Sequence, residues 1–350
     1  PVVGRGTLFP PDLRRLKAFW EGKRDQAIAD WKTGLVKLVR ELGWDAVLVH
    51  LAIGKNTPID VPEKIGESKW RDSNGNILFY SEETDRMFKT GKDPDFTPPP
   101  SASEEEPPDN SEVEPTTSEL EIVRHVVSEL GETHFIMSSP LSGHPRLKYA
   151  DAAGGGDVEK WVQFYQEPEK YYEKRMRVLN HPDVRIALQV AKREGIDGIC
   201  YGCDYGMNTG PFIPPEMFRE YILPCLAKYV ELVHSYGFVF LHHACGNNQE
   251  LMDMIVEAGV DVYQSIQPEM DIKKMKRRYG DRIALWGGVA AGDLITGTPA
   301  EVEASAKDFL ETCKPGGGYI FGTSHSVMPG AKYENYQAML RAHAKYGIYE

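Results

Sequence analysis

The fold of this chain is decided by Phe238-Val239-Phe240-Leu241-His242-His243-Ala244-Cys245-Gly246-Asn247, where an apolar run passes directly into polar and small residues. Four consecutive apolar residues bounded in this way predict a buried strand. Side chains two positions apart on an extended chain point the same way, so His243 and Cys245 are placed to grip one metal ion. A thiolate combined with an imidazole favours zinc.

Similar strand-like runs recur along the chain and alternate with amphipathic segments of helical spacing. The strand-like runs are 47–50, 134–137, 198–201, 238–242, 261–264, 283–286 and 319–321, and helices are expected near 117–130, 182–194, 215–236, 248–258, 299–313 and 333–346. Repeated strand and helix units with short connections indicate parallel strands. Because at least seven such units are present, we expect an α/β protein whose single domain, 1–350, is a (β/α)8 barrel of the TIM type.

Three segments fall outside this alternation. Apolar residues at helical spacing predict an N-terminal helical extension over 1–43, interrupted at Gly22. The turn dipeptide Asn74-Gly75 predicts a β-hairpin over 68–80. The segment 90–116 is rich in proline and glutamate, which predicts a flexible acidic insertion, either a solvated surface loop or a docking segment for a partner.

The composition argues against several classes of protein. A net charge of -12 with no basic stripe argues against a nucleic-acid partner. No apolar run approaches the roughly 20 residues that span a bilayer, and residues 1–15 have no apolar core of the signal-peptide type, so we expect a cytoplasmic protein without membrane contact. The five cysteines are scattered over a long chain, which favours reduced thiols, one or more bound to metal, over a disulfide framework.

Polar residues follow several of the predicted strands, and the carboxyl ends of barrel strands meet at one mouth, where barrel enzymes carry their chemistry. His325 follows the last predicted strand and is the candidate third ligand beside His243 and Cys245, in a zinc site with an open fourth position. The alternative is a packed, hydrogen-bonded barrel rim. Asp204 and Glu269 also follow strands and are candidate acids, although strand-end carboxylates also cap helices.

An ordered set of motifs in the second half of the chain carries a resemblance to a known family. The motifs are Asp204-Tyr205-Gly206, Gly210-Pro211, Pro215-Glu216-Met217-Phe218, His243-Ala244-Cys245-Gly246-Asn247, Gln267-Pro268-Glu269, Trp286-Gly287-Gly288, Gly317-Gly318-Tyr319-Ile320, Ser324-His325, Pro329 and Glu334-Asn335. Over about residues 195–348 they resemble the uroporphyrinogen decarboxylase superfamily, and more closely its branch of zinc- and corrinoid-dependent methyltransferases.

The resemblance implies a (β/α)8 barrel with its site at the strand ends and a zinc ion held by His243 and Cys245. The third ligand of that branch is a cysteine, whereas this sequence places His325 there, and a histidine is also a ligand that zinc accepts. The resemblance further implies a methyltransferase that moves a methyl group between a small methylated compound and a corrinoid (methylcobalamin) on a partner protein. A methoxylated aromatic is the expected donor, which would make the reaction an O-demethylation.

In this interpretation Asp204 or Glu269 supplies a proton. The residues expected to contact the substrate are Tyr205, Phe212, Gln267 and Trp286.

Two alternatives stand beside the methyltransferase hypothesis. The first is a metal-free uroporphyrinogen-type decarboxylase. Its arginine-rich amino-terminal signature, ending in Ala-Gly-Arg-Tyr, has no counterpart between Pro1 and Tyr80, and its anionic substrate would meet an acidic chain. The second is a non-catalytic barrel that binds a corrinoid or tetrapyrrole without turnover.

Overall fold

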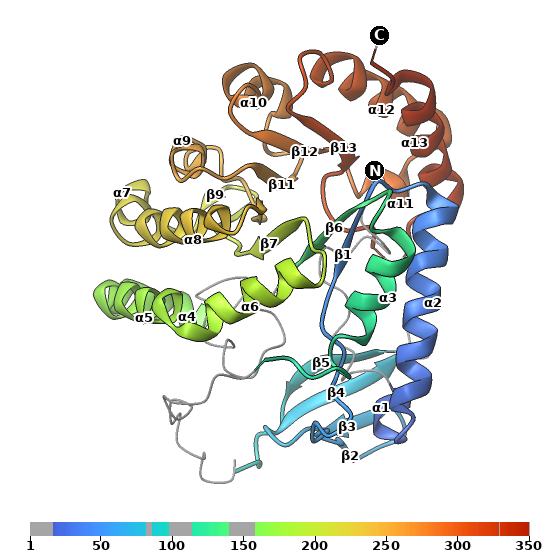
Figure 1. Cartoon of the computed structure of the whole chain (residues 1–350), viewed down its shortest axis with the longest axis vertical. Coiled ribbons are helices and arrows are strands. Elements are labelled where there is room, and N and C mark those ends of the chain that lie inside the picture. Colours follow the sequence, from blue (N-terminus) through green and yellow to red (C-terminus); the bar gives the residue numbers. More distant parts are fainter. Residues whose placement is uncertain (1–16, 82–85, 98–113, 140–157, 329, 350) are drawn as a thin grey trace.

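The computed structural model describes residues 17–81, 86–97, 114–139, 158–328 and 330–349. Its centre is a curled parallel sheet with helices around the outer side, and a small antiparallel sheet lies at one end (Figure 1). No helix in these ranges is both long enough and apolar enough to cross a membrane.

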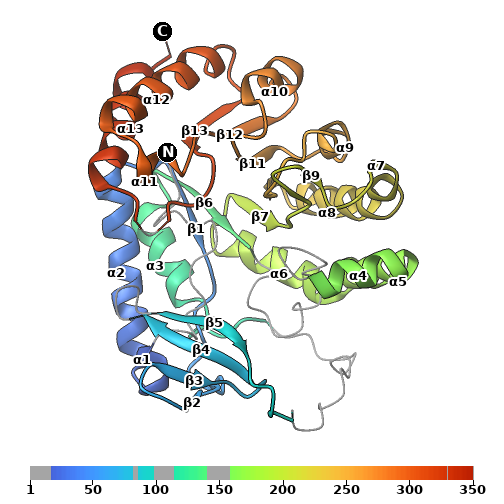
Figure 2. The ribbon, with the colours of Figure 1, turned by 180° about the vertical axis from the view of Figure 1, so that it is seen from behind.

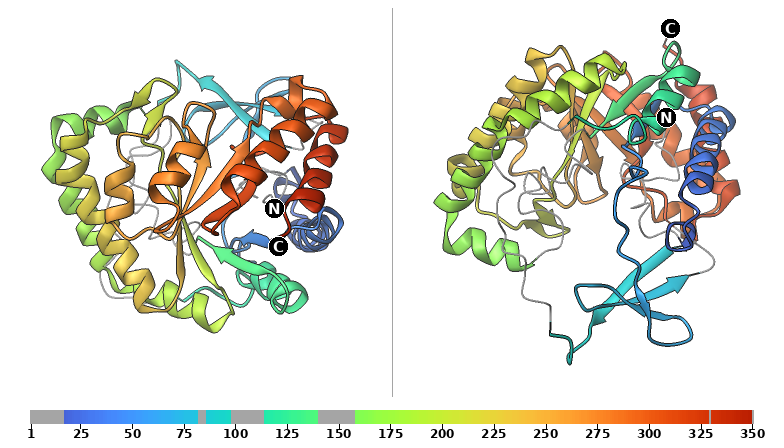
Figure 3. Two further views of the ribbon diagram at one scale, coloured as in Figure 1. Left: turned by 90° about the horizontal axis from the view of Figure 1, so that it is seen from above. Right: turned by 60° about the horizontal axis from the view of Figure 1, so that its bottom comes forward.

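The central sheet has seven strands in the described ranges, and their order in space follows their order in the sequence. They are β1 (Ala46–Val49), β6 (Phe135–Ser138), β7 (Gly198–Gly202), β10 (Val239–His243), β11 (Val262–Ile266), β12 (Ala284–Val289) and β13 (Tyr319–Thr323). Every neighbouring pair is parallel. The view from above shows the sheet curling, with β1 and β13 at its two edges (Figure 3). The predicted α/β barrel architecture is therefore confirmed.

Helices follow the barrel strands and bury their apolar faces on the outer side of the sheet. The longer ones are α2 (Arg24–Leu42), α3 (Glu121–Leu130), α4 (Val158–Gln166), α5 (Pro168–Asn180), α6 (Pro182–Arg193), α8 (Leu223–Ser235), α10 (Ile272–Tyr279), α12 (Pro299–Cys313) and α13 (Tyr333–Tyr346). Shorter helical elements are α1 (Lys17–Trp20), α7 (Pro215–Met217), the π-helix Phe218–Ile222, α9 (Met252–Glu257) and α11 (Asp293–Thr296). The start of α12 is fixed by a capping box between Thr298 and Glu301, with Pro299 as the first helical residue.

Side chains from the two faces of the central sheet form two separate parts of the core. Facing the helices are large buried residues such as Phe240, Tyr263 and Leu285, and facing the inside of the curl are Met137, Leu241 and others, as expected for strands buried on both faces. Because alternate residues take opposite faces, His242 lies among the residues packed against the helices and His243 lies on the inner face. This parity decides which of the two histidines can reach a site inside the barrel.

The small sheet consists of β2 (Glu63–Lys64), β3 (Lys69–Arg71), β4 (Asn76–Ser81) and β5 (Arg86–Lys92), all antiparallel. The predicted hairpin is present as β3 and β4, and Gly75 turns between them at a φ of 73°. The hairpin is part of a larger sheet, and β5 reaches into the range 90–116 that was predicted as an insertion. Residues 98–113 of that range lie outside the described residues.

The amino-terminal segment contacts the small sheet through α1. Gly22 separates α1 from α2 at a φ of 72°, and Trp20 of α1 packs against Trp70 and Tyr80 of the small sheet. Figures 1 and 2 both show the small sheet at the end of α2 that lies beside α1. The predicted helical extension over 1–43 is observed from Lys17 onward, and 1–16 lies outside the described residues.

Two shorter strands, β8 (Gly206–Met207) and β9 (Gly210–Pro211), pair antiparallel in the segment after β7. They belong to the rim at the carboxyl ends of the barrel strands, since Asn247 N–H donates to the Met207 carbonyl in the segment after β10.

Candidate metal centre

Three potential metal ligands meet at the carboxyl ends of β10 and β13. One ligand atom from each of His243, Cys245 and His325 lies within 4.8 Å of the others, and we call these residues the His–Cys–His cluster. His243 is the last residue of β10, Cys245 follows two positions later, and His325 follows β13. The sequence-based prediction that these three side chains converge therefore agrees with the structure.

The distances within the cluster are short, and His243 is buried while Cys245 and His325 are half-buried. Cys245 Sγ lies 3.3 Å from His243 Nε2, and the ring centroids of His243 and His325 are 5.8 Å apart. Burial raises the pKa of the Cys245 thiol to about 12, and the nearby Asp204 carboxylate adds to the rise. Burial also lowers the pKa of His243. Both shifts favour the neutral form, a thiol at Cys245 and an uncharged imidazole at His243. A bound cation would stabilise the thiolate of Cys245 and would bind the neutral imidazole directly.

The backbone around Cys245 is held by a buried asparagine. The Asn248 side chain donates to the carbonyls of Ala244 and Cys245, at 3.3 Å and 2.9 Å, and is fully buried. Gly246 has a φ of 91°, and a Cβ there would come within 2.2 Å of the Gly206 backbone. The loop after β10 can therefore lie against β8 only with glycine at this position, which fixes where Cys245 points.

Gln264 orients the imidazole of His243. The two residues are opposite each other in the register of β10 and β11, and His243 Nδ1 is hydrogen-bonded to Gln264 Oε1. Because an amide oxygen only accepts, Nδ1 carries the proton and Nε2 is left with a lone pair directed at Cys245. A ligand histidine in proteins is usually held by such a partner on its other nitrogen.

Asp204 and Gln267 accept hydrogen bonds from the backbone of the loop that carries Cys245. Asp204 Oδ1 accepts the Cys245 N–H at 2.7 Å and lies 3.9 Å from His243 Nε2. Gln267 Oε1 accepts the Gly246 N–H at 3.1 Å. Of the two carboxylates predicted from sequence, Asp204 is thus beside the cluster, whereas Glu269 is exposed in the turn after β11.

Tyr205 and Phe212 were predicted to contact the substrate, and the structure shows what each side chain packs against. Tyr205 is 1% exposed and packs between Phe218 and His242, so it belongs to the core between sheet and helices. Phe212 packs against Trp161 of α4, with ring centroids 5.6 Å apart. Tyr205 is therefore a core residue, whereas Phe212 directly follows β9 and is half-buried against α4.

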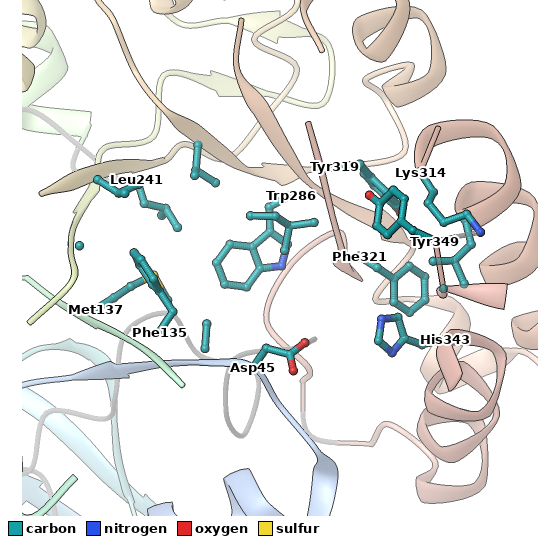
Figure 4. A pocket seen from close by; sticks show the side chains of 17 residues that line it. Asp45, Phe135, Met137, Leu241, Trp286, Lys314, Tyr319, Phe321, His343 and Tyr349 are labelled. Carbon is teal, nitrogen blue, oxygen red and sulfur yellow. The ribbon is translucent and has the colours of Figure 1, made fainter. Parts of the chain in front are cut away.

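Trp286 also lies away from the mouth. It lines a cavity of about 410 Å³ together with Met137, Leu241 and residues at the starts of several strands, including Ala46 and Val262 (Figure 4). Strand starts mark the end of the barrel opposite the His–Cys–His cluster. β12 continues through Gly287 and Gly288 to Val289, so Trp286 is inside the strand and its ring faces the barrel interior.

Sequence reasoning missed Gln264, Ser265 and Asn248. Ser265 Oγ lies 3.4 Å from Cys245 Sγ, so each residue of the local His243 and Cys245 pair has a polar partner on β11. Gln264 had a detectable signal, since a polar residue within an otherwise buried strand needs a hydrogen-bond partner. Ser265 had none, because its contact depends on a local irregularity of the strand.

Comparisons with known proteins place this geometry in a family context. A family model described as Uroporphyrinogen decarboxylase (URO-D) matches residues 84–346, a range that includes the whole His–Cys–His cluster. A uroporphyrinogen decarboxylase of Streptomyces griseus subsp. griseus is 32% identical over 117 residues, which cover 33% of this chain and 31% of that protein. One of Coxiella burnetii is 26% identical over 187 residues, covering 53% of this chain and 50% of that protein.

The match to these relatives spans about a third to a half of their length. Among solved structures, a methyltransferase from Methanosarcina mazei aligns with a TM-score of 0.59, over 99% of this chain and 94% of that chain. The sequence identity is 18%, so this similarity shows a shared fold.

Proposed function

The chain belongs to the uroporphyrinogen decarboxylase family, which has a TIM-barrel fold, and we propose that within this family it is a zinc-dependent methyltransferase. The proposed reaction moves a methyl group between a small methylated compound, such as a methoxylated aromatic, and a corrinoid carried by a partner protein. The observation that supports the proposal is the His–Cys–His cluster, which lies where barrel enzymes carry their chemistry.

The donor set of the cluster suits zinc. His243, Cys245 and His325 would hold the ion through two nitrogens and one sulfur, and three protein ligands leave a fourth position for a substrate atom. Lewis-acid polarisation of the donor oxygen is the chemistry that zinc supplies in such a site. Gln264 keeps His243 in the tautomer whose Nε2 can bind a metal.

Asp204 is the proposed proton donor. When the methyl group leaves a methoxylated donor, the electron pair of the broken carbon–oxygen bond stays on the oxygen, which then needs a proton. The Asp204 carboxyl lies beside the cluster, and its side chain is 29% exposed, so it can exchange protons with solvent. Glu269, exposed in the turn after β11, is the second choice for this role. Gln267 would act on the substrate indirectly, by holding the loop at Gly246.

A second candidate is metal-free decarboxylation of a tetrapyrrole, which the names of the curated relatives favour. Such a substrate carries several carboxylates, and the net charge of -12 on this chain disfavours binding of so anionic a molecule. Decarboxylation also leaves the convergence of two imidazoles and a thiol without a role. Incubation with uroporphyrinogen, followed by analysis for coproporphyrinogen, separates the two candidates. A barrel that only binds a corrinoid or tetrapyrrole would give a bound ligand and no product in either assay.

Elemental analysis of the purified protein tests the proposal directly. We expect about one zinc per chain, with loss of zinc and of methyl transfer in His243→Ala and Cys245→Ala. Cys313→Ala is the matched control, because Cys313 is a buried cysteine of α12 that is not part of the cluster. Full retention of zinc in both cluster variants would contradict the proposal.

A further inference from the structure

Ser265 departs from the rest of β11 in its backbone. Its φ is 81°, and no other non-glycine residue in the described ranges has a positive φ. The register of β11 on β12 shifts at the same point, since Gln264 pairs with Trp286 and Ile266 pairs with Gly287. Ser265 is therefore the extra residue of a β-bulge.

The bulge allows two consecutive side chains to reach one site. In a regular strand, neighbouring side chains point to opposite faces. Here Gln264 is hydrogen-bonded to His243, and the hydroxyl of Ser265 lies 3.4 Å from the sulfur of Cys245. Bulges commonly redirect a side chain beside an active site in this way.

The hydroxyl is what serine contributes at this position. Glycine adopts a positive φ without strain, whereas serine is strained there. Ser265 is also completely buried, so its hydroxyl depends on protein partners for hydrogen bonding. A serine hydroxyl can donate, and a metal-bound thiolate can only accept, so metal binding would fix the direction of the hydrogen bond from Ser265 to Cys245.

We propose that Ser265 is a positioning residue that donates a hydrogen bond to the Cys245 thiolate in the zinc-loaded protein, holding it as a ligand and weakening it as a nucleophile. This inference rests on the proposed zinc site. A hydrogen bond withdraws charge from the sulfur, and a site that handles electrophilic methyl groups has to keep them off its own ligand sulfur. With this hydrogen bond, Cys245 would bind the metal without being methylated itself.

Alkylation of the zinc-loaded protein by iodoacetamide measures this nucleophilicity, because the thiolate displaces iodide and the modified peptide is counted by mass spectrometry. Cys245 is the one cysteine of the five that is not buried, so its reaction can be followed separately. Ser265→Gly removes the hydroxyl and the backbone strain, and Ser265→Ala removes only the hydroxyl. Ser138→Ala is the control, since Ser138 is another buried serine of the barrel, at the end of β6.

Both Ser265 variants should alkylate at Cys245 roughly three- to tenfold faster than the unmodified chain, the effect of losing one hydrogen bond. The control should not change. With cobalt(II) in place of zinc, the sulfur-to-metal charge-transfer band should shift in both variants, which a purely structural role of Ser265 would not cause. Loss of the metal from both Ser265 variants but not from the control would also support the inference.

Equal alkylation rates in Ser265→Gly and the unmodified zinc-loaded protein would overturn the role of Ser265 and leave the proposed zinc site standing. A faster rate only in Ser265→Ala would overturn it too, because that result would assign the effect to backbone strain. Absence of zinc from the unmodified protein would overturn the metal site and this inference together.

Discussion

Gln264 and His243 face each other across the pair β10 and β11, and the amide oxygen of Gln264 accepts the hydrogen on Nδ1 of His243. This contact selects the tautomer of His243 with a free Nε2, which is the form that the proposed zinc site requires. The arrangement leads to a prediction about metal affinity that does not require the substrate to be known.

Gln264→Met keeps the volume of the side chain but removes the acceptor, and we expect it to weaken zinc binding roughly 10- to 100-fold. Gln264→Glu retains an acceptor oxygen at the same reach. It should therefore bind zinc more tightly than Gln264→Met, by roughly the same 10- to 100-fold. Competition with a chelating dye measures both affinities. Unchanged zinc affinity in Gln264→Met would show that the orientation of His243 is set by other contacts.

Gly246→Ala tests whether the close approach of the loop to β8 positions Cys245. A Cβ at this position would meet the Gly206 backbone at 2.2 Å, so the loop must move, and we expect loss of zinc together with a destabilisation of about 2–4 kcal/mol. Gly43→Ala is the control, because Gly43 also has a positive φ, 62°, but an added Cβ there meets nothing within 4 Å. Gly43→Ala should lower the free energy of unfolding by about 1 kcal/mol and leave the zinc content unchanged. Chemical unfolding and elemental analysis measure the two quantities.

Much of the barrel and the core of the site could be predicted because their signals are local in sequence. Each buried strand is an apolar run, and the carboxyl ends of parallel strands meet at one edge, so His243, Cys245 and His325 could be brought together without a structure. The identity of the third residue, a histidine after the last strand, followed from the same rule.

The orientation of other side chains could not be predicted, because it depends on where each strand ends. Tyr205 lies beyond the end of β7, where the alternation of faces no longer applies, and it turned into the helix-facing core. Trp286 was taken as the end of its strand because two glycines follow, yet β12 continues to Val289. Ser265 depends on the register between two strands, which no single segment of sequence contains.

We expect Arg24, the first residue of α2, to contribute more to stability than any other polar side chain of that helix. It is 8% exposed, and its guanidinium donates to the carbonyls of Ile53 and Ser118 at 2.8 Å and 2.7 Å and to Glu121 at 2.9 Å. Arg24→Ala removes the donor to the Ile53 and Ser118 carbonyls and one of the two cations paired with Glu121, and we expect a loss of about 2–4 kcal/mol in the free energy of unfolding.

The matched control for Arg24→Ala is Arg40→Ala on the same helix. Arg40 is paired with Glu129, but its side chain is 55% exposed, so its removal should cost less than about 1 kcal/mol. Urea unfolding followed by circular dichroism gives both values. Equal costs for the two arginines would contradict the role assigned to Arg24.

His343 gives the fold a pH dependence that can be isolated by one substitution. Its ring stacks on Phe321, with centroids 5.4 Å apart and an angle of 6° between the rings, and burial lowers the pKa of His343 below its ordinary value of 6.5. As the pH falls through 6.5 the unfolded chain therefore binds a proton at this residue while the folded chain does not, so folding stability decreases. His343→Phe keeps the stacked ring and removes the titration. The melting temperature of this variant should consequently fall less than that of the unmodified chain between pH 7.5 and pH 5.5, about one unit on either side of that value. Parallel decreases for both proteins would mean that His343 is protonated equally in the folded and unfolded states.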